Sequence, residues 1–487
     1  MVGDRSMTRV ANGEAVETRA IPRLPMEEFR ATVIGAVEKG ARIAALFARP
    51  PEMFVVLAHG LDGVLSLAAT TAAASYPALT PDCPQAHWFE REIAETWKIV
   101  PEGHPWLKPI RFLSGAPAVT EYFQVRGEEV HEVAVGPVHA GIIEPGHFRF
   151  QCHGERAMHL EISLGYQHRG VERALAGGPD KRTVHYMETL AGDTSVGHAT
   201  AYAQNVEALA GTAVPARGLT LRGIGLELER LANHTGDLGA LANDVGYLPT
   251  ASFCGRLRGD FLNLTALLCG SRFGRGLVRP GGVRFDADAA KVGEARKRLA
   301  AARRDVTGAV DLLWKTPSVM ARFEGTGTVP RETCEDLGLV GPAARACGIE
   351  RDVRLEFPSG IYRFAQIPVS TWGTGDVFAR AYVRWMEIER SLEFVEEQLA
   401  QLPAGATREA PGRIEPGRTA VSLVEGWRGE ICHVAMTDEH GRFGAYKVVD
   451  PSFHNWIGLA MALREQEISD FPLCNKSFNL SYCGHDL

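Results

Sequence analysis

The amino-acid sequence predicts an α+β fold, in which a mostly α-helical bundle with small flanking β-sheets follows a smaller α+β domain. Five long helical patterns lie between residues 195 and 402, and such lengths are typical of a helical bundle. Shorter β-rich segments, separated by turns that contain glycine or proline, precede and follow them. A chain of 487 residues is also long enough to form two or more domains.

The composition is that of an ordinary globular protein. Apolar residues make up 45% of the chain and charged residues 23%, and the mean hydropathy is -0.09. The net charge of -7 gives no indication of nucleic-acid binding. The N-terminus has no signal-peptide pattern, and the most apolar window, residues 54–74, is interrupted by His59 and Asp62. We therefore expect a cytoplasmic location, with membrane contact only through partner proteins.

Nine cysteines occur singly, without a Cys-x-x-Cys pair. An odd number of isolated thiols argues against a disulfide framework and for a reducing compartment, where most thiols are buried as small apolar groups. No ferredoxin-like spacing is present, so we expect no metal and no iron–sulfur cluster to be bound by this chain itself. No GxGxxG motif follows a predicted strand, so NAD binding is not supported.

The elements are predicted in the following order. Residues 1–25 are expected to be a flexible leader, and residues 26–118 a small α+β domain containing a hairpin whose turn is Gly60-Leu-Asp-Gly63. Residues 119–487 form the large domain, which opens with a strand at residues 146–152. Its helices are predicted at residues 195–211, 217–243, 252–276, 286–315 and 376–402, and its last strands at residues 420–426, 430–437 and 443–449.

The large domain carries seven motifs in a fixed order. They are Val135-Gly-Pro-Val-His139, Glu144-Pro-Gly-His-Phe-Arg149, Tyr166-Gln-His-Arg-Gly-Val-Glu172, Leu226-Glu-Leu-Glu-Arg-Leu-Ala-Asn-His234, Arg279-Pro-Gly-Gly-Val283, Glu425-Gly-Trp-Arg-Gly-Glu430 and Asp470-Phe-Pro-Leu-Cys-Asn-Lys-Ser-Phe-Asn-Leu480. Through them, residues 119–487 resemble the large subunit of energy-converting nickel–iron hydrogenases of the formate-hydrogenlyase and hydrogenase-4 type. They also resemble its homologue, the quinone-site subunit of respiratory complex I, but the resemblance is greatest to the formate-hydrogenlyase and hydrogenase-4 type and their cysteine-free relatives.

The small domain has a resemblance of its own. Residues 26–115 resemble the complex I subunit that packs beside the quinone-site subunit, through Trp88-Phe-Glu-Arg-Glu-Ile93 and Gly103-His-Pro105. The order of the two parts is that of a fused two-subunit protein, and the resemblance covers nearly the whole chain.

The nickel ligands of the hydrogenase family are missing. The resemblance places four thiols at positions where this chain has Ala191, Thr194, Ser481 and Gly484. A methyl, a hydrogen or a neutral hydroxyl is a poor substitute for a soft, charged thiolate. Cys483 lies near the last pair in a different register, and one thiol does not replace four. The complex I tyrosine that donates to quinone aligns with Gly192, so that group is missing too.

Two residues suggest proton chemistry, one between the first two missing ligands and one shortly after them. Asp193 and His198 are expected to line the cavity and to transfer protons. The alternative, compatible with the first, is that Asp193, Thr194 or Ser195 caps the helix that begins here.

Further candidate residues follow from the resemblance. His168, Arg169 and Gly170 match a motif beside the iron–sulfur cluster of a neighbouring subunit, where a cation stabilises the reduced cluster. The alternative is an interface arginine paired with Glu172. His139 and His147 fall in the loop that contributes to the quinone pocket of complex I, and only one of them is equivalent. The alternative for each is a solvated loop histidine.

Three remaining positions concern helices and their ends. Asp244 matches a complex I aspartate that couples quinone chemistry to proton movement, or is simply the polar end of a helix. Arg230 and His234 lie four residues apart, on one helix face, and are expected to make interhelical contacts. Arg279 is expected to have a structural role near the cluster.

The leading hypothesis is an electron-transfer subunit of a membrane-associated, respiratory-type oxidoreductase that couples redox chemistry to ion translocation without a nickel–iron centre. The resemblance implies an iron–sulfur small subunit and antiporter-like membrane subunits as partners, with quinone or another small carrier as acceptor. The first alternative is a structural or coupling subunit with an inactive cavity. The second is a nickel–iron hydrogenase large subunit.

Overall fold

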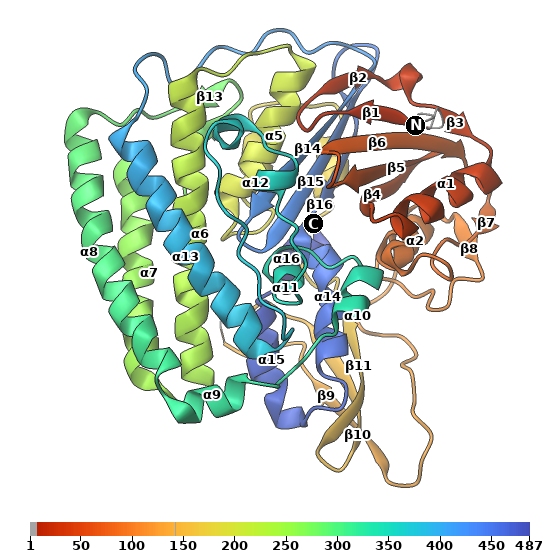
Figure 1. Ribbon diagram of the computed structural model, residues 1–487. Coiled ribbons are helices and arrows are strands. Elements are labelled where there is room, and N and C mark those ends of the chain that lie inside the picture. Colours follow the sequence, from red (N-terminus) through yellow and green to blue (C-terminus); the bar gives the residue numbers. More distant parts are fainter. Residues whose placement is uncertain (1–6, 142) are drawn as a thin grey trace.

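The computed structural model describes residues 7–141 and 143–487. A bundle of long helices forms one side of the molecule, and β-sheets with short helices form the other (Figure 1). The bundle consists of α6 (Ala216–Asp244), α7 (Leu248–Cys269), α8 (Ala289–Trp314) and α13 (Val377–Ala400). Helix α6 contacts both α7 and α13, so it is largely buried, whereas α8 lies on the outside. The predicted α+β class, with a mostly helical large domain, is confirmed.

The N-terminal part contains an antiparallel sheet of β4 (Arg42–Arg49), β5 (Glu52–His59) and β6 (Val64–Thr71). The predicted hairpin is confirmed, because β5 and β6 pair from Glu52 with Thr71 to His59 with Val64 across the predicted turn. Helices α1 (Met26–Glu38) and α2 (His87–Trp97) pack against this sheet.

The prediction of a flexible leader is wrong for the part of it that the structure describes. Residues Thr8–Val10 (β1) and Arg23–Leu24 (β3) both pair with β6, and Ala15–Glu17 (β2) pairs with a strand of the distant C-terminal sheet. These short segments cover sheet edges whose N–H and C=O groups would otherwise lack partners. Residues 1–6 lie outside the described residues.

The C-terminal sheet has the order β16–β15–β14–β2. Strands β14 (Arg418–Gly426), β15 (Gly429–Thr437) and β16 (Phe443–Val449) form the antiparallel meander that the alternation of strands and turns predicts. Helix α5 (Ser195–Leu209) packs on β14 and β15, and it lies between this sheet and α6. The candidate site lies at the N-terminal end of α5.

A third sheet of β9 (Val130–Val135), β10 (His147–His153) and β11 (Arg156–Ser163) extends away from the rest of the molecule (Figure 1). It includes the predicted strand at residues 146–152. The shorter elements are β7 (Ser75–Pro77), β8 (Val100–Glu102), α3 (Val171–Leu175), α4 (Thr183–Met187), β12 (Val278–Arg279), β13 (Gly282–Val283), α9 (Pro317–Phe323), α10 (Arg331–Asp336), α11 (Gly341–Arg345), α12 (Val353–Glu356), α14 (Pro451–Ala462), α15 (Phe471–Phe478) and α16 (Tyr482–Asp486).

The predicted long helices agree with the structure to within a few residues, with one exception. The helix expected to continue to residue 276 ends at Cys269, because Gly270 adopts a left-handed conformation with φ of 78° and its N–H closes the last turn on Ala266 O. A glycine in this position is a common helix terminator, since the missing Cβ removes the steric cost of positive φ.

Buried ion pairs join the N-terminal part to the large domain. Arg42 on β4 contacts Glu430 on β15 and, at 3.1 Å, Glu356 at the end of α12. Lys447 on β16 donates to both carboxylate oxygens of Glu92 on α2 at 2.6 Å. Breaking one partner of such a pair leaves an uncompensated buried charge, so these contacts hold the two parts in one arrangement.

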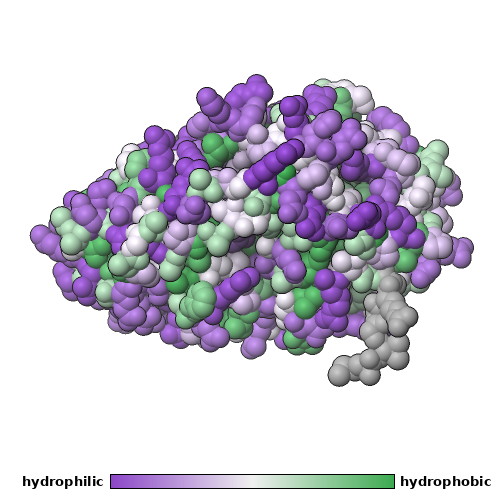
Figure 2. Space-filling model, turned by 90° about the horizontal axis from the view of Figure 1, so that it is seen from above, coloured by the Kyte–Doolittle hydropathy of each residue, from purple (hydrophilic) through white to green (hydrophobic). Residues whose placement is uncertain are grey.

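In the part of the chain that the structure describes, no helix is both long and apolar enough to cross a membrane. The face seen in Figure 2 is mostly hydrophilic, with scattered apolar spots. All nine cysteines are buried and none forms a disulfide, as their isolated spacing predicts.

Candidate functional site

The two segments with missing thiols meet in the interior of the molecule. Ala191 and Thr194 lie in the loop before α5, whereas Ser481 and Gly484 belong to the start of α16, and all four are buried. The guanidinium of Arg169 connects the two segments, since it donates to Leu190 O at 3.0 Å and to Cys483 O at 3.2 Å.

The side chains at these positions do not fit a nickel–iron centre. The Ser481 hydroxyl accepts a hydrogen bond from Gly484 N at 2.9 Å and so caps α16, and the Thr194 hydroxyl contacts Asp193 and Arg428. A Cβ atom on Gly484 would lie 2.7 Å from Cγ of Asp450, so a cysteine at this position would have to displace the Asp450 carboxylate. Among the described residues, no group of three or more His, Cys, Asp and Glu side chains is arranged to hold a metal ion.

His198 is fully buried at the centre of a hydrogen-bonded chain. Its Nε2 lies 3.0 Å from Asp450 Oδ2, and its Nδ1 lies 3.0 Å from Nε2 of His433. His433 Nδ1 in turn lies 2.9 Å from the hydroxyl of Tyr446. Burial opposes the ionisation of Asp450, but the hydrogen bond from His198 and the charge of Arg428 hold the pKa of this carboxyl below its ordinary value. Burial lowers the pKa of His433 well below that of a free imidazole.

Asp193, the other predicted proton carrier, is part of an ion pair. Its two carboxylate oxygens accept from Arg428 at 2.6 and 2.8 Å. Burial would raise the pKa of Asp193, yet the Arg428 charge outweighs it and the pKa lies below its ordinary value. A carboxylate stabilised in this way is a poor proton acceptor near neutral pH.

The N-terminus of α5 is capped by a residue from another helix, and not by Asp193, Thr194 or Ser195 as predicted. No side chain at Thr194 caps the helix, and the Ser195 hydroxyl donates to Glu188 O. Instead, Glu229 of α6 accepts from Val196 N at 2.7 Å and from Gly197 N at 3.1 Å. Local sequence cannot reveal a cap that comes from 33 residues away in the chain.

The motif His168–Gly170 is held against the last residues of the chain. Arg169 N and Gly170 N donate to Leu487 O, and His168 Nδ1 lies 2.8 Å from Asp486 O. The alternative that paired Arg169 with Glu172 is wrong, because Glu172 accepts from Val448 N and lies 3.0 Å from the ammonium of Lys447. Arg169 is exposed, and its guanidinium donates to the carbonyls of Leu190, before Ala191, and of Cys483, before Gly484.

A cavity of about 740 Å³ adjoins this motif, between the N-terminal part and the large domain. His168, Gly170 and Glu172 line it together with apolar side chains such as Trp97 and Phe112. Its volume is in the range of small-molecule and cofactor pockets.

The two loop histidines point to different neighbours. His139 Nε2 lies 3.3 Å from the hydroxyl of Tyr482, so His139 contacts the residue directly after Ser481. His147 is buried and accepts from Arg149 Nε at 3.2 Å, and its ring packs against Tyr122. The structure therefore brings His139, but not His147, next to the C-terminal ligand segment.

The remaining predicted residues have structural contacts. Asp244 is the last residue of α6 and is exposed, as the helix-end alternative describes. His234 Nε2 lies 2.8 Å from Glu387 on α13, and Arg230 lies 3.6 Å from the same carboxylate, so the predicted interhelical contacts are confirmed; Arg230 also binds the carbonyls of Glu425 and Gly426 on β14. Arg279 donates to Glu188 at 2.8 Å and steadies the segment before α5.

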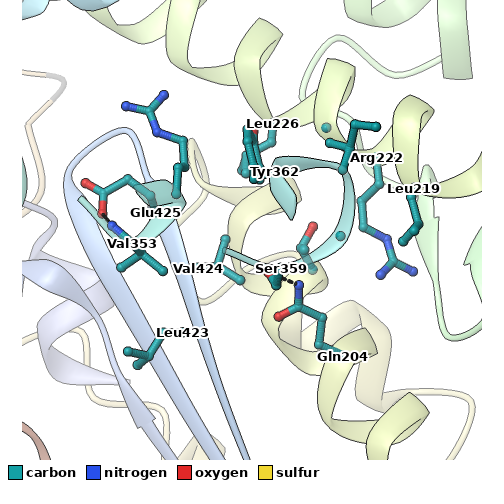
Figure 3. A pocket seen from close by; sticks show the side chains of 15 residues that line it. Gln204, Leu219, Arg222, Leu226, Val353, Ser359, Tyr362, Leu423, Val424 and Glu425 are labelled. Carbon is teal, nitrogen blue, oxygen red and sulfur yellow. Dashed lines mark hydrogen bonds between the residues drawn. The ribbon is translucent and has the colours of Figure 1, made fainter. Parts of the chain in front are cut away.

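A second cavity, of about 30 Å³, lies between α5, α6 and the loop after α12 (Figure 3). Gln204 donates to Ser359 at its edge, while Thr200 Oγ1, Gln204 Oε1 and Arg222 Nε have no protein partner among the described residues. A space of this size with three such atoms suits one ordered water and is too small for a redox carrier.

Known proteins are similar to this chain in sequence. The family model of the respiratory-chain NADH dehydrogenase 49 Kd subunit matches residues 244–418, and that of the 30 Kd subunit matches residues 36–122. Formate hydrogenlyase subunit 5 from Escherichia coli (strain K12) is 31% identical over 436 residues, which cover 84% of this chain and 77% of the relative. NADH-quinone oxidoreductase subunit 4 from Thermus thermophilus is 30% identical over 370 residues, which cover 70% of this chain and 90% of the relative.

The chain belongs to the family that these hydrogenase and NADH-quinone oxidoreductase subunits share. Hydrogenase-4 component G from Escherichia coli (strain K12) is a further relative, 29% identical over 435 residues, which cover 84% of this chain and 76% of the relative. The predicted resemblance is confirmed, including the fusion of a 30 Kd-like part to a 49 Kd-like part.

The sequence did not predict the residues that surround Asp193 and His198 in the structure. Arg428 and Glu229 lie inside motifs that carry the resemblance, at Glu425–Glu430 and Leu226–His234, and these motifs were the available signal. Asp450, His433 and Tyr446 lie in none of the seven motifs. Asp450 has a recognisable local role as the N-cap of α14, where it accepts from Ser452 N, but that role does not reveal its contact with His198.

Proposed function

We propose that this chain is the electron-transfer subunit of a membrane-associated, respiratory-type oxidoreductase, related to NADH-quinone oxidoreductase and hydrogenase-4, that works without a nickel–iron centre. Electron transfer in this complex would be coupled to ion translocation by other subunits. Family membership and the retained motif around Arg169 support the proposal.

One observation carries it. Arg169 is exposed on one side, while its guanidinium binds Leu190 O and Cys483 O, one residue before Ala191 and Gly484. A fixed cation at this point lowers the electrostatic cost of reducing a cluster placed beside it. The position where an electron would arrive is therefore in direct contact with both segments that enclose the former metal site.

The partners follow from the same surface. An iron–sulfur small subunit would bind over His168–Gly170 and the adjoining 740 Å³ cavity, which both apolar and charged side chains line. Antiporter-like membrane subunits would anchor the complex, with this chain on the cytoplasmic face. The iron–sulfur cluster would belong to the small subunit, and the acceptor would be a quinone or another small carrier.

A second candidate function is a structural or coupling subunit with an inactive cavity. It is favoured by the internal contacts of the former ligand segments, because Thr194, Ser481 and Asp193 all bind other protein groups. Such a subunit would transmit conformational change between partners without any chemistry of its own.

The two candidates differ in a measurable way. The complex should be purified with its native partners, analysed for nickel and iron, and assayed for hydrogen, quinone and ferredoxin turnover. Electron-transfer function predicts iron without stoichiometric nickel, together with turnover that falls when Arg169 is replaced by alanine. Unchanged turnover in an assembled Arg169→Ala complex would favour the coupling role, and a full nickel complement would contradict both.

A further inference from the structure

Four buried side chains from four different elements form one continuous chain of hydrogen bonds. Asp450 precedes α14, His198 lies on α5, His433 on β15 and Tyr446 on β16, and the three links measure 3.0, 3.0 and 2.9 Å. Each side chain is at most 5% exposed. We propose that these groups form a proton relay that ends at Asp450, in the space that a thiolate at position 484 would need.

The direction of the relay follows from the donor and acceptor properties of its members. An ionised carboxylate only accepts, so His198 must carry a proton on Nε2. In the relay that we propose His198 is neutral and accepts at Nδ1, which requires a proton on Nε2 of His433. His433 consequently accepts at Nδ1, and the Tyr446 hydroxyl must donate. All three hydrogen bonds therefore point toward Asp450, and each ring nitrogen of His198 and His433 has a partner.

Each proton that moves along the relay has a donor and an acceptor. Asp450 takes the Nε2 proton of His198, His198 takes the Nε2 proton of His433 at Nδ1, and His433 takes the Tyr446 proton at Nδ1. Tyr446, which also lines the 740 Å³ cavity, regains a proton from a hydronium ion of solvent there. The net result is one carboxylic acid at Asp450, one water molecule, and two neutral histidines with exchanged tautomers.

The surroundings keep the relay in one protonation state at rest. Burial raises the pKa of Tyr446 and lowers that of His433, so neither group is charged near neutral pH. The charge of Arg428 acts on Asp450 and favours its carboxylate form. Use of this proton during turnover rests on the proposed electron-transfer function, whereas the order of the hydrogen bonds does not.

The relay is tested by the histidine tautomers of the full chain. The protein is labelled with 15N-histidine, and long-range 1H–15N spectra are recorded at neutral pH. The signals are assigned by their loss in His198→Gln and His433→Gln variants. We expect both rings to be neutral and to carry their proton on Nε2. A proton on Nδ1 of His433, or a doubly protonated His198, would overturn the proposal.

Coupling along the relay is tested by removing its acceptor. Asp450→Leu should shift the ring signals of His433 as well as those of His198, although Asp450 contacts only His198. Ser452→Ala is the matched control, because Ser452 neighbours Asp450 and accepts from Ser481 N but is not a member of the relay. Unchanged His433 signals in a folded Asp450→Leu protein would contradict the relay. If the Asp450→Leu variant does not fold, the tautomers of His198 and His433 in the wild-type protein still test the proposed relay.

Discussion

Arg428 holds both carboxylate oxygens of Asp193, at 2.6 and 2.8 Å, and its guanidinium lies 3.9 Å from the ring centre of Trp427. The same guanidinium donates to Asn479 O, so it links the loop before α5 to the loop before α16. Planar, bidentate geometry of this kind suits arginine and not lysine. The pair accounts for why Asp193, which sequence analysis selected as a proton carrier, is in fact an anchor of the site.

Replacement of Arg428 is therefore expected to destabilise the protein. Arg428→Met leaves Asp193 without its counter-charge, and because the Asp193 side chain is 33% exposed we expect a loss of about 1–3 kcal/mol, less than for a fully buried pair. Arg428→Lys keeps the charge but not the bidentate contact, so we expect an intermediate loss. The free energy of unfolding in urea measures both. Equal stability of wild type and Arg428→Met would show that the pair contributes nothing.

A cysteine at position 484 should be rejected by the fold. Its Cβ would lie 2.7 Å from Cγ and 2.8 Å from Oδ2 of Asp450, and overpacking of this kind costs about 1–3 kcal/mol. Gly484→Cys should cost less stability in an Asp450→Ala background than in the wild type, because the obstructing carboxylate is gone. The Asp450→Ala single variant is the reference, since it loses the cap of α14 and the contact with His198. Ser481→Cys serves as the control, since it loses only a helix cap, at about 1 kcal/mol. Thermal unfolding distinguishes these variants, and a fully stable Gly484→Cys variant would contradict the clash.

Arg169 should be needed for electron transfer but not for assembly. Arg169→Ala removes the donors to Thr189, Leu190 and Cys483 carbonyls and the charge at the partner surface. Loss of such an outer-sphere group typically lowers activity roughly 10-fold or more. Arg169→Lys should retain part of the activity because the charge remains. The checks are co-purification of partners and electron-transfer rate, and loss of assembly in both variants would instead indicate a docking role.

Much of the fold could be predicted because its signals are local. Periodicity and turn residues located α5, α6, α8, α13 and the meander from β14 to β16. The error in residues 8–24 has a non-local cause, since these short strands are stabilised by pairing with β6 and β14, far away in the sequence. A segment of three residues carries too little pattern to show that it completes a distant sheet.

The candidate site divides in the same way. The absence of cysteine at Ala191 and Gly484 can be predicted once the motifs of this chain are aligned with those of the hydrogenase family. What replaces them is not visible, because Asp450 reaches the site only through tertiary packing. Its contact with His198 joins residues 252 positions apart, and no motif spans them. The capping error at α5 has the same origin, since Glu229 displaces the local candidates from the helix terminus.

Glu229 should make the stability of the protein depend on pH. Burial raises the pKa of Glu229 in the folded protein to about 8, whereas the unfolded chain releases this proton near pH 4.3. Between these two values the native state binds more protons than the unfolded state. Stability therefore falls as the pH rises through this window, by at most about 1.4 kcal/mol per pH unit, and the contribution is fully present only below the unfolded pKa.

Glu229→Gln removes this titration while it keeps one oxygen to accept from the N-terminus of α5. The difference in unfolding free energy between wild type and variant should thus shrink, or reverse in favour of the variant, between about pH 5 and pH 8. Urea unfolding at several pH values within this window measures that difference. A difference that stays constant with pH would show that Glu229 is already ionised in the folded protein and acts as a permanent anionic cap. Its two backbone contacts, at 2.7 and 3.1 Å, would then favour the charged form enough to offset the cost of burial.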